Sequence, residues 1–196
     1  MVNDRPADSF AAARRAMIDS QLRVSGVNEE VVLNAVNAVA REAHVPADAK
    51  AHAYIDRAVP LADGRFLAAP LFYGRLLTEV TPKSDDTVLV VDGGSGYLPA
   101  LARRFGASVD VVDAAAAGTA TGTYTLLLID GAVEEIPAAL ADRLADNARI
   151  GAGLVERGVT RLAVGTKTAG EVALLTVVEM GIPVLPAFAK AKGWSF

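Results

Sequence analysis

The sequence predicts an α/β fold with a largely parallel sheet behind a helical N-terminal region, and two observations carry this prediction. The apolar run Val88–Val91 leads into a glycine-rich turn at 92–96 and then into helical spacing at 98–105, the order of a parallel strand and its crossover helix. The first 80 residues instead place apolar side chains three and four positions apart, as amphipathic helices do.

Three helices are expected in the first 80 residues. The first begins near Asp8 or Ser9, either of which can cap it, and stops around Gly26. The second follows Asn28 as its capping residue, and the third runs over residues 71–80 after an irregular stretch. The second helix is expected to bury one apolar face, made of Val31, Val32, Ala35, Val36 and Val39.

Strands, turns and helices alternate in the remainder of the chain. The expected strands are 88–91, 109–112, 125–129, 150–155, 161–164 and 171–179, and the expected helices are 98–105 and 136–145. We therefore divide the chain into a helical, loop-rich N-terminal region, residues 1–80, and an α/β core, residues 81–196, which together form one structural unit.

The link between the second and third strands is unusually short. Only ten residues, 114–123, separate them, whereas a parallel crossover with its helix needs roughly a dozen or more. The link is therefore expected to be a simple loop over the sheet edge. Strand 109–112 would then be an edge strand, which proteins cover or pair, so we expect either a homodimer through this side or capping by the N-terminal helices.

Composition excludes several classes of function. With 19 basic and 23 acidic residues, the net charge of -4 gives no electrostatic reason to bind nucleic acid or a membrane surface. No apolar stretch approaches the roughly 20 residues of a membrane span, and the polar start lacks the order of a secretory signal. Because the chain has no cysteine, thiolate metal sites and disulfides are impossible, and the cytoplasm is the expected location.

Two further expectations concern histidine and the C-terminus. His44 and His52 are expected away from the carboxyl ends of the strands, and two histidines without further ligands make no metal site. The segment 189–196, with Trp194 and Phe196, is expected to pack back on the sheet.

The glycine-rich turn is the strongest candidate for a ligand site. Ligands of open α/β sheets bind beyond the carboxyl ends of the strands, where glycines let the backbone approach them closely. Asp113 ends the next strand, where an acid commonly accepts hydrogen bonds from ribose hydroxyls, so the pair suggests an adenosyl ligand. A dinucleotide fingerprint fails because Pro99 stands at its third glycine, and a plain structural turn remains the alternative.

Several motifs follow one another along nearly the whole chain. They are Met17–Ile18 with Gln21–Leu22, Arg41–Glu42 with Val45–Pro46, Gly64–Pro70, Gly94–Tyr97, and Ile129–Ala132 with Ile136–Pro137. In this order they resemble the protein-L-isoaspartate O-methyltransferase family. The resemblance implies a Rossmann-like sheet that binds S-adenosylmethionine and transfers its methyl group to the side carboxylate of an L-isoaspartyl residue, a damage product, in a protein or peptide.

The resemblance also assigns the site residues. The cofactor-binding residues would be Asp92, Gly93, Gly94, Ser95, Gly96, Tyr97 and Asp113, with Asp130 and Gly131 from a later strand, and the substrate loop would be Leu67, Ala68, Ala69 and Pro70. No metal is implied. The substrate carboxylate is itself an ionised nucleophile at neutral pH, so the enzyme's task is positioning, not proton removal.

The chain departs from the family at three places, which mark it as a divergent and shortened member. Ala68 stands where the family has Ser or Thr, and losing such a hydrogen bond to a charged group costs about 1.5–3 kcal/mol, roughly 10- to 100-fold. The family's strand-end acid and first glycine fall on Val90 and Asp92. The link 114–123 has no room for the helix, strand and acidic loop that close over the adenine, so the sheet is expected to lack one strand and helix.

Two functions therefore remain open from the sequence. One is an isoaspartate-repair methyltransferase, and the other is a catalytically inactive binding or interaction protein that keeps the same fold. A dinucleotide-dependent oxidoreductase is disfavoured by the failed fingerprint.

Overall fold

The structure, a computed structural model, describes residues 6–190 and has a six-stranded sheet at its centre. The strands are β3 (Thr87–Asp92), β4 (Ser108–Asp113), β5 (Tyr124–Val133), β6 (Leu144–Glu156), β7 (Val159–Thr168) and β8 (Glu171–Glu179). Their order is β4-β3-β5-β6-β7-β8, in which the first four strands are parallel, β7 pairs antiparallel with β6, and β8 pairs antiparallel with β7. The expected α/β class is confirmed.

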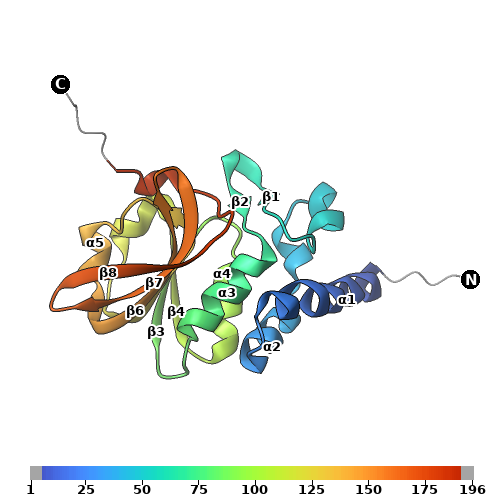
Figure 1. The fold of residues 1–196 in the computed structure, drawn as a ribbon, viewed down its shortest axis with the longest axis horizontal. Helices are drawn as coiled ribbons and strands as arrows, with labels where there is room; N and C mark the ends of the chain where they lie inside the picture. Colours follow the sequence, from blue (N-terminus) through green and yellow to red (C-terminus); the bar gives the residue numbers. More distant parts are fainter. Residues whose placement is uncertain (1–5, 191–196) are drawn as a thin grey trace, which may run out of the picture.

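Helices cover one face of this sheet. They are α1 (Pro6–Met17), α2 (Glu30–Ala38), α3 (Pro70–Val80) and α4 (Tyr97–Ala102), and a small hairpin of β1 (Val59–Pro60) and β2 (Phe66–Leu67) precedes α3. In Figure 1, α3 lies between the sheet and the pair α1 and α2. One apolar core joins Met17 and Val36 to Leu77 and to Val88 of the sheet, so the N-terminal helices share their core with the strands.

The second face of the sheet carries its own core with little helix over it. Short segments cover it, namely α5 (Ala138–Ala141) and two 3-10 turns at Ala114–Thr119 and Pro186–Phe188. The helix expected at 136–145 is therefore wrong in length. It stops early because Leu144 already pairs with Tyr124 as the first residue of β6.

Two details of α2 also differ from expectation. The helix begins at Glu30, its N-cap residue is Glu29, and no side chain caps it, so Asn28 is not the cap. Val31 is 47% exposed, while Val32, Leu33 and Val36 are buried. Successive residues of a helix point about 100° apart, and a face centred on Val32 and Val36 turns Val31 toward solvent.

The short link crosses the sheet instead of passing over its edge. β5 pairs with β3 on the side opposite β4, so the chain from β4 to β5 must run across the face of β3. The 3-10 turn Ala114–Thr119 does this, and Ala117 and Ala120 are buried in the second core. Along the chain no strand is formed between the end of β4 and the start of β5, and β4 is left at the edge of the sheet with Val111 40% exposed.

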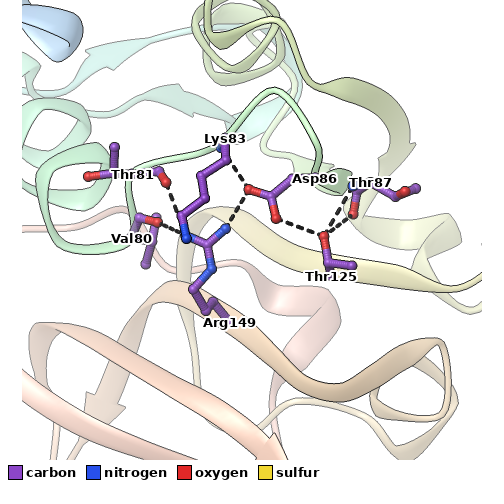
Figure 2. Close-up of polar contacts among 7 residues, drawn as sticks. All are labelled: Val80, Thr81, Lys83, Asp86, Thr87, Thr125 and Arg149. Carbon is purple, nitrogen blue, oxygen red and sulfur yellow. Dashed lines mark hydrogen bonds and ion pairs between the residues drawn. The ribbon is translucent and has the colours of Figure 1, made fainter.

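A polar cluster ties the amino ends of the strands together (Figure 2). Arg149 of β6 donates to the carbonyls of Val80 and Thr81 and to the carboxylate of Asp86, which also accepts from the Thr125 hydroxyl at 2.8 Å. Burial raises the pKa of Asp86, but the hydrogen bonds from Arg149, the Lys83 amide and Thr125 outweigh burial, and the net pKa is lowered. The cluster holds the strands together at their amino ends, opposite the glycine turn at their carboxyl ends.

Two expectations from the sequence concern the C-terminal segment and membrane-spanning helices. Residues 191–196, including Trp194 and Phe196, lie outside them, so the packing of the C-terminus stays a prediction. Within residues 6–190, no helix has the length and apolar character needed to cross a membrane.

Candidate functional site

The glycine turn follows β3 at the carboxyl end of the sheet and has a closed geometry. Gly94 and Gly96 have φ of 103° and 67°, values that glycine adopts without strain. The Gly96 amide donates to the Asp92 carboxylate at 3.0 and 3.2 Å. Asp92, which stands where the family it resembles has its first glycine, therefore occupies one N–H of the turn that a ligand could otherwise bind.

Asp130 joins this turn from the neighbouring strand. A register shift between Leu128 and Ala132 marks a bulge in β5, and such bulges re-aim side chains. The Asp130 carboxylate, 2% exposed, accepts from the hydroxyls of Tyr73 at 2.7 Å and Ser95 at 3.2 Å. Burial raises the pKa of Asp130 to about 7, and the negative charge of Asp92 acts in the same direction, whereas the Tyr73 hydrogen bond opposes them.

The predicted substrate loop is bonded to the same cluster. The amide of Ala68 donates to the Tyr73 hydroxyl at 3.1 Å, and its carbonyl accepts from Arg41 at 2.5 Å. A chain of hydrogen bonds thus runs from Ala68 through Tyr73 and Asp130 to Ser95 of the turn. Leu67, Ala68 and Pro70 are buried, and Ala69 is half-buried.

Three residues of this cluster were missed by sequence reasoning. Arg41 is fully buried, donates also to the Ala53 carbonyl at 2.6 Å, and lies 5.2 Å from the ring centre of Tyr97. His44 places Nδ1 2.8 Å from the Ser95 carbonyl oxygen, so the expectation that it lies away from the strand ends is wrong. Tyr73 is the third, and burial raises its pKa well above the ordinary value.

Asp113 and Arg65 complete the outer side of the turn. One Asp113 oxygen accepts from the Ala115 amide at 2.9 Å and starts the 3-10 turn, while the other lies 3.7 Å from Nη1 of Arg65. The Arg65 side chain covers Gly94 so closely that a Cβ there would lie 2.5 Å from Nη1. The α-carbon of Gly131 faces Leu185, and a Cβ there would lie 2.6 Å from Leu185 Cγ.

A largely apolar cavity of about 510 Å³ adjoins the substrate loop. Its lining includes Phe66, Ala69, Leu71, Met180, Ile182 and Pro183. Asp56 and Arg57 add one charge of each sign. Among residues 6–190, the structure holds no group of three or more histidine, aspartate or glutamate side chains able to bind a metal ion.

The family is settled by comparison with known proteins. The family model of protein-L-isoaspartate(D-aspartate) O-methyltransferase (PCMT) matches residues 12–117, more than half of the chain. The chain belongs to the PCMT family. The matched residues include the substrate loop, the glycine turn and Asp113, and the match ends inside the short link.

Individual PCMT relatives match most of the chain. A protein-L-isoaspartate O-methyltransferase of Roseiflexus castenholzii is 29% identical over 72% of this chain and 77% of its own length. One from Methanoculleus marisnigri is 27% identical over 96% of each chain. That alignment spans 215 positions against the 196 residues here, so at least 19 positions (215 minus 196) have no residue in this chain. The comparison supports a shortened family member.

A solved structure shows the same fold. The crystal structure of a putative PCMT from Plasmodium falciparum, in complex with S-adenosyl-L-homocysteine, superposes with a TM-score of 0.71 at 17% identity and covers 89% of this chain and 98% of the other. The expected Rossmann-like methyltransferase sheet is confirmed.

Proposed function

We propose that this protein transfers a methyl group from S-adenosylmethionine to the side carboxylate of L-isoaspartyl residues in proteins or peptides. The observation that carries the proposal is the hydrogen-bonded path from Ala68 to Ser95 through Tyr73 and Asp130. Two segments that separately resemble a substrate loop and a cofactor turn are thus joined into one hydrogen-bonded unit. Membership of the PCMT family supports the same activity.

The residues of the turn fit an adenosyl ligand on the condition that the Arg65 side chain moves away from it. Gly93 lets the turn pack closely against β5, since a Cβ there would lie 2.5 Å from the Asp130 carbonyl oxygen. The Asp113 side chain, 54% exposed, has one oxygen whose neighbour is the Arg65 guanidinium. Gly93–Gly96 and Asp113 would hold S-adenosylmethionine once Arg65 turns aside, which its 44% exposed side chain permits.

S-adenosylmethionine, when bound, supplies an electrophilic methyl group: a new C–O bond forms to the substrate carboxylate as the S–CH3 bond breaks and its electron pair stays on sulfur. The chain's own task is to orient the carboxylate. Arg41 and Tyr73 fix the backbone of Ala68 on both sides, and the adjoining cavity offers an apolar surface to the peptide around the damaged residue.

A second candidate is a binding protein of the same fold without catalysis. Arg65 covers Gly94, Asp92 takes the Gly96 amide, and Ala68 lacks a hydroxyl, and each of these removes a contact that a cofactor or substrate would use.

Calorimetric titration with S-adenosylmethionine, followed by a methyl-transfer assay, separates the two candidates. An isoaspartyl peptide is the substrate, and the aspartyl peptide of the same sequence is the control. Saturable binding with methylation of only the isoaspartyl peptide supports the repair activity. Binding without methylation favours the second candidate, and the absence of binding at millimolar ligand refutes the first.

A further inference from the structure

Arg65 occupies the ligand-facing side of the glycine turn. Its Nη1 and Cδ lie 2.5 and 2.6 Å from the position that a Cβ of Gly94 would take. The guanidinium lies 3.7 Å from Asp113 and 3.8 Å from Asp63. Because Arg65 directly precedes β2, it reaches from the hairpin that carries the substrate loop to the carboxyl ends of β3 and β4.

The contact is displaceable. Both ion pairs of Arg65 are long and solvent-exposed, with 54% of the Asp113 side chain and 84% of the Asp63 side chain accessible, and such pairs hold weakly. A ligand that offers hydroxyls to Asp113 therefore has a weak competitor for that carboxylate. When the guanidinium moves aside, the backbone of Arg65 stays in place beside the turn. The positive charge therefore remains near the bound ligand.

That charge affects two adenosyl ligands differently. S-adenosylmethionine carries a sulfonium cation where S-adenosylhomocysteine has a neutral thioether, and the two are otherwise alike. A guanidinium is charged at every pH at which a protein folds, so it repels the sulfonium and leaves the thioether unaffected. Asp92 and Asp130 are present in every Arg65 variant, so their effect on the two ligands is the same in each and drops out when the variants are compared.

We infer that Arg65 is a specificity-determining residue of the glycine turn, one that shifts its preference from the sulfonium cofactor toward the thioether product. The inference rests on the proposed function and deepens it. For two like charges a few ångströms apart and screened by water, as at this exposed side chain, the expected effect on the ratio of the two dissociation constants is about tenfold.

The test is calorimetric titration of the full chain and its variants with each ligand separately. Arg65→Gln keeps a long polar side chain without the charge, and it is expected to lower the ratio of Kd for S-adenosylmethionine to Kd for S-adenosylhomocysteine about tenfold. Arg65→Lys keeps the charge and should keep the ratio. Arg104→Gln, at an exposed site after α4, makes the same change in net charge and should also keep the ratio.

Each outcome decides the inference. A lowered ratio for Arg65→Gln alone supports it, as does binding of S-adenosylmethionine that appears only in that variant. An unchanged ratio, or the same change in Arg65→Lys, overturns it while leaving the proposed function intact, since the ligands still bind. If neither ligand binds any variant at millimolar concentration, the inference and the proposed cofactor fail together.

Discussion

Replacing Asp130 by asparagine should make the protein's stability less sensitive to pH. The carboxylate is buried and accepts from the Tyr73 and Ser95 hydroxyls. An asparagine side chain at this position would have almost the same shape, and its amide oxygen can still accept from Tyr73. The substitution therefore removes the titration of this group with little change in packing.

The size of the effect follows from the raised pKa. The pKa of Asp130 is about 7 in the folded state and 3.8 ordinarily, a difference of about three units, each of which corresponds to about 1.4 kcal/mol. Between these pH values the folded state keeps a proton that the unfolded state has lost, so the free energy of unfolding falls as pH rises. Relative to Asp130→Asn, the unmodified protein should lose about 4 kcal/mol between pH 4 and pH 8.

Urea unfolding at several pH values measures this difference, because all other titrating groups are common to the two proteins. Asp146→Asn makes the same change of side chain at an exposed aspartate and is the matched control. A difference between the protein and Asp130→Asn that stays constant from pH 4 to pH 8 would refute the assignment of a raised pKa to Asp130.

Three further predictions concern the substrate loop, the strand ends and the sheet edge. If the protein is an active methyltransferase, Ala68→Ser should raise kcat/KM for an isoaspartyl peptide about 10- to 100-fold, whereas Ala69→Ser should not, and equal rates would argue against a role for the hydroxyl. Asp86, whose pKa is lowered mainly by Arg149 against the effect of burial, stabilises the fold at neutral pH. The destabilisation caused by Asp86→Asn in urea unfolding should therefore shrink as pH falls, and a constant difference would contradict this. Finally, the exposed edge strand β4 predicts a homodimer that Val111→Lys weakens, and a concentration-independent monomer in analytical ultracentrifugation would exclude it.

Local patterns predicted those parts of the fold that are set by neighbouring residues. Strand β8 runs from Glu171 to Glu179, the range expected for a strand after the 165–170 turn, and α3 begins at Pro70, one residue before the expected start. The helix expected at 136–145 failed because a tertiary contact, the pairing of Leu144 with Tyr124, overrides helical spacing there.

The sequence predicted only part of the candidate site, because the rest is formed by tertiary contacts. The glycine turn and the substrate loop carry sequence motifs, but the residues that join them do not. His44 and Ser95 are 51 positions apart, and Tyr73 and Asp130 are 57 apart. Arg41 belongs to a motif that indicates the family, yet only the fold shows that it is buried against the carbonyls of Ala53 and Ala68.

Whether the site can still serve a cofactor depends on which of its acids are already satisfied. Asp92 accepts from the Gly96 amide, and Asp130 accepts from two hydroxyls while its pKa near 7 leaves it partly protonated at neutral pH. Both carboxylates are therefore already engaged in hydrogen bonds within the protein. Asp113 differs, because one of its oxygens has only a weak, exposed partner in Arg65. The affinity of this turn for an adenosyl ligand thus depends on how readily Asp113 exchanges a guanidinium for a hydroxyl, and substitutions at Arg65 act on that exchange directly.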